Sequence, residues 1–159
     1  MTHRLLLLLA CLLVATTVRA QETAWKAGVA SAAITPRESM WMAGYASRNK
    51  PSEGQVHELY AKALALEDAA GTRLVLVTTD LIGIPRELRD WLEAEVNAKF
   101  QIAPAGLLLN ASHTHCGPEL RVSKASVYGL EPERVRQSQA YADTLKETLS
   151  NLVGQAIAR

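Results

Sequence analysis

The amino-acid sequence predicts an α/β fold, in which a mixed β-sheet contains an antiparallel hairpin and a βαβ unit and is flanked by helices. Three observations predict it: two apolar runs joined by a short glycine-containing connector, a strand–helix–strand pattern over residues 72–109, and an amphipathic segment near the carboxyl end. The 159 residues, of which 48% are hydrophobic and 21% charged, fit one globular domain. The net charge of +1, without a run of lysine and arginine, gives no reason to expect a nucleic-acid partner.

The first strand is expected within residues 25–34. This segment alternates small and branched apolar residues, and it stops at Thr35-Pro36, where proline removes a backbone donor. Residues 47–54 are polar and rich in residues that break regular structure, which is typical of a surface loop.

A hairpin is expected next, from two apolar runs at residues 59–66 and 72–79. The connector between them, residues 67–71, is short and contains glycine, as antiparallel hairpins require. Within the second run, Leu74 to Val77 are all apolar, which predicts a strand in the middle of the sheet with both of its faces covered.

The remaining elements are two helices and one more strand. Arg86 to Phe100 follows Pro85 and carries apolar residues at spacings of three and four, which predicts an amphipathic helix. Leu107 to Leu109 then begins a buried strand, parallel to the previous one. Residues 133–157 are expected to form the last helix. The chain stops at Arg159, where a further strand would be expected, so we predict an incomplete domain.

The amino-terminal residues 1–20 predict a cleavable signal peptide. A short basic lead is followed by an apolar run from Leu5 to Val14, and Val18-Arg19-Ala20 supplies small residues before a cleavage point after Ala20. The run is too short for a membrane span, so we expect a secreted or periplasmic protein without a stable membrane anchor. A lipoprotein box around Cys11 is the less favoured alternative. After cleavage Cys116 is the single cysteine, which excludes an intramolecular disulfide.

The strongest candidate for chemistry is the segment Asn110 to Pro118, which contains His113 and His115. Two imidazoles released from a buried strand into a Gly-Pro turn suit a metal site, and the alternative is a pair of polar loop residues. Asp80 ends the neighbouring parallel strand, so its carboxylate should meet His113 at the same sheet edge, where ligand sites of α/β sheets gather. Asp80 is a candidate catalytic residue, and capping of the following helix or support of the site is favoured over direct ligation of a metal ion.

Other residues carry weaker signals. Cys116 is a packed residue, a soft metal ligand or a nucleophile next to His115, and catalysis is the least favoured of the three. His57 is expected to be a solvated surface residue. Four further residues are expected to line an apolar entrance or to pack in the core: Met40, Trp41, Met42 and Tyr45. The chain has no GxGxxG, P-loop or GxSxG motif, which disfavours nucleotide-binding and α/β-hydrolase functions.

Five motifs, taken in order, resemble the start of the neutral/alkaline (non-lysosomal) ceramidases. They are Ala27-Gly28-Val29 leading to Ile34-Thr35-Pro36, Met42-Ala43-Gly44-Tyr45-Ala46, Leu59-Tyr60-Ala61-Lys62-Ala63-Leu64, Thr79-Asp80-Leu81, and His113-Thr114-His115-Cys116-Gly117-Pro118. The resemblance implies that residues 21–159 are the amino-terminal part of a catalytic domain. The sequence differs from the usual family pattern at two positions of this resemblance: Cys116, where serine is usual, and Glu119, where glycine is usual.

The resemblance also implies an activity, namely a zinc amidase that hydrolyses the amide of ceramide or related N-acyl lipids to a fatty acid and a sphingoid base. The first histidine of the motif, here His113, is then a zinc ligand, and His115 contacts the substrate head group. The family's other zinc ligands lie downstream of this chain, so the 159 residues alone are expected to be inactive. Two alternatives stay open: a secreted metallohydrolase or esterase acting on another substrate, and an exported domain without catalysis.

Overall fold

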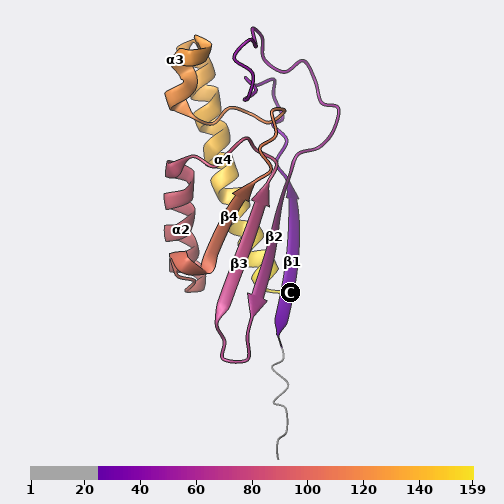
Figure 1. The fold of residues 1–159 in the computed structure, drawn as a ribbon, viewed down its shortest axis with the longest axis vertical. Helices are drawn as coiled ribbons and strands as arrows, with labels where there is room; N and C mark the ends of the chain where they lie inside the picture. Colours follow the sequence, from indigo (N-terminus) through magenta and orange to yellow (C-terminus); the bar gives the residue numbers. More distant parts are fainter. Residues whose placement is uncertain (1–24) are drawn as a thin grey trace, which may run out of the picture.

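The computed structural model describes residues 25–159, so the predicted signal peptide and Cys11 lie outside the described residues. One mixed sheet of four strands, in the order β1-β2-β3-β4, forms the centre of the fold (Figure 1). The first three strands are antiparallel neighbours, and the last pairs parallel with β3. The strands are β1 (Lys26–Ala33), β2 (Tyr60–Glu67), β3 (Arg73–Thr79) and β4 (Leu107–Ala111).

The predicted hairpin and βαβ unit are both confirmed. β2 and β3 pair in register from Ala61 opposite Thr79 to Glu67 opposite Arg73. The helix α2 (Arg86–Phe100) connects β3 to β4, whose register begins with Val75 beside Leu107. As expected from its place in the hairpin and the βαβ unit, β3 has a strand on each side.

Within residues 25–159, three α-helices follow the strands or connect them. α2 begins directly after Pro85, whose φ of −58° suits a helix start, and ends at Gln101 in the left-handed region. The last helix, α4 (Pro132–Ile157), has a proline in its first turn and is one residue longer than predicted. The four-residue helix α3 (Ala125–Tyr128) was not predicted, because so short a segment shows no periodicity.

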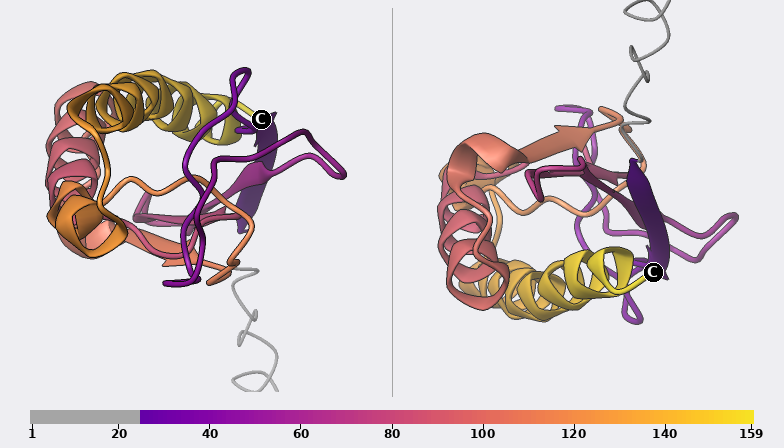
Figure 2. Two further views of the ribbon diagram at one scale, coloured as in Figure 1. Left: turned by 90° about the horizontal axis from the view of Figure 1, so that it is seen from above. Right: turned by 90° about the horizontal axis from the view of Figure 1, so that it is seen from below.

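The core lies between the sheet and the long helices. α4 packs against β1 and β2, and α2 packs against α4, so that both helices lie on the same side of the sheet (Figure 2). Gly28 makes this contact close, because a Cβ there would lie 2.0 Å from the carbonyl oxygen of Ala156. The largest side chains that this layer buries completely include Val75, Val77, Leu92, Val96, Leu145, Leu149 and Val153.

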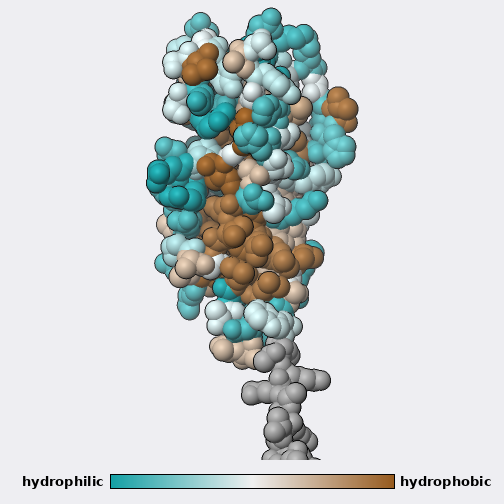
Figure 3. All heavy atoms as spheres, viewed as in Figure 1, coloured by the Kyte–Doolittle hydropathy of each residue, from teal (hydrophilic) through white to brown (hydrophobic). Residues whose placement is uncertain are grey.

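The other face of the sheet carries no helix among residues 25–159. Apolar side chains gather there (Figure 3), and Val29, Leu74 and Leu108 are 59%, 40% and 51% exposed. The prediction that the apolar run Leu74 to Val77 is covered on both faces is therefore wrong for the described part of the chain. Only its alternate residues Val75 and Val77 are fully buried, since side chains along a strand point to opposite faces. In the same range, 25–159, no helix is long and apolar enough to cross a lipid bilayer.

Candidate active site

The loops at the carboxyl ends of the parallel strands bring the predicted site residues to one end of the sheet, at the top of Figure 1. Beyond the last ladder pair, Thr79 beside Ala111, the two chains continue side by side. The amide of Ser112 donates to the carbonyl of Thr79 (2.9 Å), and that of Thr114 donates to the carbonyl of Leu81 (3.2 Å). Asp80 and His113 therefore lie on neighbouring segments just beyond the two parallel strands, as the parallel arrangement predicts.

The His113 side chain is oriented by the segment beside it. Its Nδ1 lies 2.8 Å from the carbonyl oxygen of Ile82. A carbonyl oxygen only accepts, so Nδ1 carries the proton, and in this tautomer Nε2 is the nitrogen with a lone pair to donate. The residue as a whole is exposed. Metal-binding histidines commonly hold their second nitrogen in this way. The residue adopts φ of +59°, which is uncommon for a residue with a side chain and clusters at functional sites.

His115 is half-buried and is held between two other rings. Its centroid lies 4.8 Å from that of Tyr45, with the planes at 75°, and 5.3 Å from that of His113, at 63°. The backbone of Gly44 packs against the same imidazole, where a Cβ would lie 2.4 Å from the His115 Cγ. Gly44 also has φ of +106°, so both its space and its backbone conformation require glycine.

The loop that carries these contacts is joined to the histidine loop by backbone hydrogen bonds. The amide of Ala43 donates to the carbonyl of Gly117 (2.9 Å), and the amide of Glu119 donates to that of Trp41 (2.9 Å). Met40 and Trp41 are buried beneath this pairing, which confirms a core position for them, whereas Tyr45 is 54% exposed. The motifs around residues 42–46 and 113–118 thus form one structural unit.

Glu119 is buried and paired. The side chain is 2% exposed, and the Arg121 guanidinium binds both carboxylate oxygens, through Nε at 2.6 Å and through a terminal nitrogen at 2.5 Å. The backbone amide of Arg121 also donates to this carboxylate (2.9 Å). The hydrogen bond to Glu119 raises the pKa of Arg121 above its ordinary value. The carboxylate therefore fixes the chain just after the Gly117-Pro118 turn.

Asp80 supports the strands and does not cap a helix. Its carboxylate accepts a hydrogen bond from the amide of Tyr60 (2.9 Å), and its own amide donates to the carbonyl of Tyr60 (2.9 Å). The helix α2 has no side-chain cap at Pro85. This contact holds the start of β2 against the end of β3, and it leaves Asp80 at the wall of the cleft described next.

A cleft of about 1380 Å³ opens beside this end of the sheet. Ser112, Thr114 and Cys116 line it, together with Asp80 and parts of the segment 35–59, whereas the intervening residues His113 and His115 do not. Cys116 is exposed with a free thiol. The residues that line the cleft thus alternate along the chain with the two histidines. We infer that the cleft and the imidazoles lie on different sides of the segment 112–116.

The wall of the cleft also carries His57 and Glu58. His57 is exposed, as predicted, and its Nδ1 lies 2.8 Å from the Glu58 carbonyl. The Thr35 hydroxyl hydrogen-bonds to the Glu58 carboxylate, and this contact lowers the pKa of Glu58 below its ordinary value. The same hydroxyl accepts a hydrogen bond from the amide of Leu59 (2.8 Å), so these residues fix the approach to β2.

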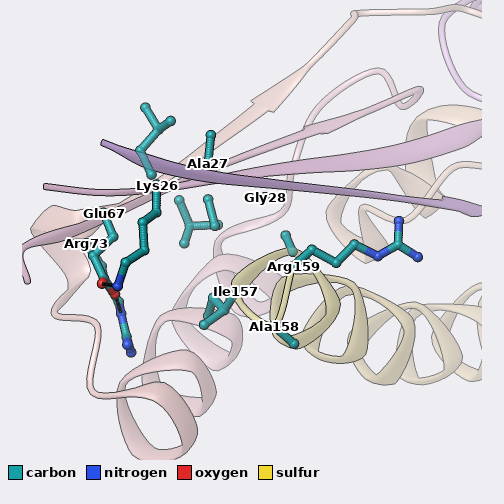
Figure 4. A pocket seen from close by; sticks show the side chains of 12 residues that line it. Lys26, Ala27, Gly28, Glu67, Arg73, Ile157, Ala158 and Arg159 are labelled. Carbon is teal, nitrogen blue, oxygen red and sulfur yellow. Dashed lines mark hydrogen bonds and ion pairs between the residues drawn. The ribbon is translucent and has the colours of Figure 1, made fainter. Parts of the chain in front are cut away.

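A smaller cavity of about 300 Å³ lies between β1–β3 and the end of α4 (Figure 4). Its charged groups pair with each other, because Glu67 contacts Lys26 at 2.8 Å and Arg73 at 2.7 Å. The hydrogen bond from Lys26, followed by that from Arg73, lowers the pKa of Glu67 to about 2. The remaining charged side chain of the lining, Arg159, donates from a terminal guanidinium nitrogen to the carbonyl of Val29 (3.3 Å). The residues of the candidate site lie at the other end of the sheet.

The described residues do not contain a complete metal site. No group of three or more histidine, cysteine or acidic side chains between residues 25 and 159 is placed to hold a metal ion together. A catalytic zinc site needs three protein ligands. His113 fits the role of a single ligand, since the residue is exposed and the Ile82 carbonyl orients its ring through Nδ1, not Nε2.

Comparison with known proteins shows that both the fold and the sequence of this chain are similar to those of neutral ceramidases. The structure of neutral ceramidase from Pseudomonas aeruginosa matches with a TM-score of 0.67 and 27% identity, over 87% of this chain and 22% of that one. A ceramidase complexed with C2 gives the same TM-score with 28% identity, over the same shares of the two chains. In sequence, the P. aeruginosa neutral ceramidase is 35% identical over 118 residues, which are 70% of this chain and 18% of that protein.

The chain therefore spans about a fifth of the length of these relatives. A family model described as neutral/alkaline non-lysosomal ceramidase, N-terminal, matches residues 25–139, a range that contains all four strands and both histidines of the site. The order of the five motifs, the fold and this match agree. The chain belongs to the neutral/alkaline non-lysosomal ceramidase family.

Proposed function

We propose that this chain supplies part of the active site of a zinc-dependent amidohydrolase that cleaves the amide of ceramide or a related N-acyl lipid. His113 is the zinc ligand and His115 contacts the substrate head group. The observation that carries the proposal is the hydrogen bond from Nδ1 of His113 to the Ile82 carbonyl, because it uses Nδ1 and leaves the lone pair of Nε2, in an exposed residue at the sheet edge, outside that contact. Membership of a ceramidase family supports the choice of substrate class.

The chemistry suits an amide, which resists hydrolysis. Zinc, when bound, supplies a water of pKa lowered toward about 7 and polarises the amide carbonyl. The protein's part is to hold His113 in one tautomer and to keep His115 next to it, with ring centroids 5.3 Å apart. The role of Asp80 is structural: its carboxylate accepts the hydrogen bond from the amide of Tyr60 and thereby fixes one wall of the cleft.

The rest of the zinc site is proposed to come from polypeptide other than residues 25–159, since these contain no cluster of three potential ligands. The 159-residue chain by itself should therefore bind zinc with less than one ion per chain and should not turn over ceramide. We also propose a secreted or periplasmic location, which the basic lead and apolar run of residues 1–20 support.

A chimaeric enzyme tests this function directly. Residues 25–139 replace the matching segment of the P. aeruginosa neutral ceramidase, and hydrolysis of an N-acyl sphingosine is measured together with the zinc content. We expect an active chimaera that loses both zinc and activity on His113→Ala. His57→Ala is the matched control, because His57 has the same Nδ1 contact with a carbonyl oxygen but lies in an exposed part of the cleft wall.

A panel of short esters separates the proposed reaction from its main alternative. Hydrolysis of the esters without hydrolysis of the N-acyl sphingosine would contradict the amide substrate. Equal activity and equal zinc content in the chimaera with His113→Ala would contradict the assignment of the ligand.

A further inference from the structure

Arg48 connects the wall of the cleft to the backbone of the histidine loop. A terminal nitrogen of its guanidinium donates to the carbonyl oxygen of His115 at 3.1 Å, across sixty-seven positions of sequence. Its amide donates to the carbonyl of Tyr45 (3.1 Å), which closes a turn over residues 45–48. The side chain is half-buried and also lines the cleft. Arg48 thus lies between the cleft and the imidazole pair.

The same guanidinium packs on the ring that touches His115. Its Cζ lies 5.7 Å from the centroid of Tyr45, and the Tyr45 ring meets the His115 ring edge-on at 4.8 Å. Tyr45 is otherwise 54% exposed, so burial alone does not fix the position of its ring. A cation over an aromatic face is attracted by the ring quadrupole, and a planar guanidinium also stacks on it.

The Arg48 Nε is buried and has no hydrogen-bond partner among residues 25–159. A buried polar atom without a partner is unfavourable, and each such atom in a folded protein needs a reason. An arginine free to move would turn this nitrogen toward water. The carbonyl of His115 and the face of Tyr45 instead hold the guanidinium in place, which indicates that its position is determined by these two contacts.

We propose that Arg48 is a positioning residue for His115. It fixes the backbone of His115 through the carbonyl and fixes the ring of His115 through Tyr45, so both ends of the residue depend on one guanidinium. The proposal deepens the proposed function, on which its catalytic meaning rests, but the contacts themselves involve neither zinc nor substrate.

Arginine is suited to this task in a way that lysine is not. The planar guanidinium presents several donors in a fixed fork and a flat face at the same time, so it binds the carbonyl and packs on Tyr45 together. An ammonium group is a compact point charge that reaches one of these partners at a time. Arg48→Lys should therefore keep part of the effect, and Arg48→Met should keep none.

The test is the nuclear Overhauser cross-peak between the ring protons of Tyr45 and His115 in the 159-residue protein, measured at the same pH for every variant. We expect the cross-peak to be lost in Arg48→Met and weakened in Arg48→Lys. Arg37→Met is the matched control, because Arg37 lines the same cleft and is exposed. The cross-peak between Trp41 and Tyr128, whose centroids are 5.9 Å apart, reports whether the loop stays folded.

Two results would overturn the proposal. One is an unchanged cross-peak between Tyr45 and His115 in Arg48→Met. The other is its loss together with the cross-peak between Trp41 and Tyr128, because Arg48 would then hold the whole loop rather than His115. The sample contains no zinc and no substrate. An inactive chimaera would therefore contradict the proposed function without affecting this measurement. An unchanged cross-peak in Arg48→Met would contradict the role of Arg48 without affecting the proposed function.

Discussion

Replacement of Gly44 by alanine should displace the imidazole of His115. The new Cβ would lie 2.4 Å from Cγ, 2.6 Å from Cβ and 2.8 Å from Nδ1 of His115. Carbon atoms in contact are usually about 3.5–4.0 Å apart, so relief of the clash requires a shift of roughly 1 Å or more. The backbone at φ of +106° adds strain of order 1–3 kcal/mol for a residue with a side chain.

Together with an unfavourable rotamer at His115, these effects should lower the free energy of unfolding by about 2–4 kcal/mol. Two glycines serve as matched controls. Gly71→Ala introduces backbone strain without a clash, since its φ is +83° and no atom lies within 4 Å, whereas Gly54→Ala introduces neither.

Urea denaturation gives the free energies of unfolding, and the cross-peak between the rings of Tyr45 and His115 reports the displacement. We expect the loss of stability to increase from Gly54→Ala to Gly71→Ala to Gly44→Ala, with the cross-peak changed in Gly44→Ala alone. If Gly44→Ala is no less stable than Gly71→Ala and its cross-peak is unchanged, close packing of Gly44 against His115 is refuted.

Three further predictions concern the fold and its ion pairs. Leu92 is fully buried, so Leu92→Ala should lower the free energy of unfolding, measured by urea denaturation, by about 2–5 kcal/mol. Leu108 is 51% exposed, so Leu108→Ala should change it by roughly 0.5 kcal/mol or less. Equal losses of stability in the two variants would contradict a core on one face of the sheet only. Arg121→Met leaves the buried Glu119 carboxylate without its partner and should cost about 2–4 kcal/mol, which Glu119→Gln in the same background should partly restore. The pKa of Glu67 is lowered from 4.5 to about 2, so its contribution to stability is present above pH 4.5 and is lost as the pH falls to about 2. The difference in stability between wild type and Glu67→Gln should disappear over that range, and a difference that persists at pH 2 would contradict the pairing.

Local patterns in the sequence were sufficient to predict the hairpin, the βαβ unit and both long helices. Each depends on residues close in sequence: the connector with Gly71 joins β2 to β3, and Pro85 begins α2. The five ordered motifs were likewise sufficient to predict the family, which the match over residues 25–139 confirms. The position of Asp80 and His113 on neighbouring segments followed from the parallel pairing of β3 and β4.

The coverage of the sheet could not be predicted in the same way. An apolar run such as Leu74 to Val77 indicates that a strand is suited to burial on both faces. It does not indicate whether residues 25–159 also supply the layers that cover those faces. In the described part of the chain α4 and α2 cover one face only. Leu74 consequently remains 40% exposed.

Contacts between loops could not be predicted from the sequence either. Arg48 and His115 are sixty-seven positions apart, and neither lies in a periodic segment whose neighbours can be inferred. Gly44 was noted only as part of a family motif, and Tyr45 only there and as a possible entrance or core residue, so neither was predicted to hold His115. A polar residue such as Glu119 next to a Gly-Pro turn gave no sign that it would be buried, since its pairing depends on the rotamer of Arg121.

The central claim is that His113 offers Nε2 to a metal ion while Ile82 holds Nδ1. Long-range ¹H–¹⁵N spectra of the 159-residue protein, recorded during a titration with Zn²⁺, test it most directly because they report the two ring nitrogens separately. We predict a proton on Nδ1 throughout, a zinc-dependent shift of Nε2, and loss of that response in His113→Ala. A proton on Nε2 in the metal-free protein, or a titration in which zinc perturbs His57 and leaves His113 unchanged, would contradict the account.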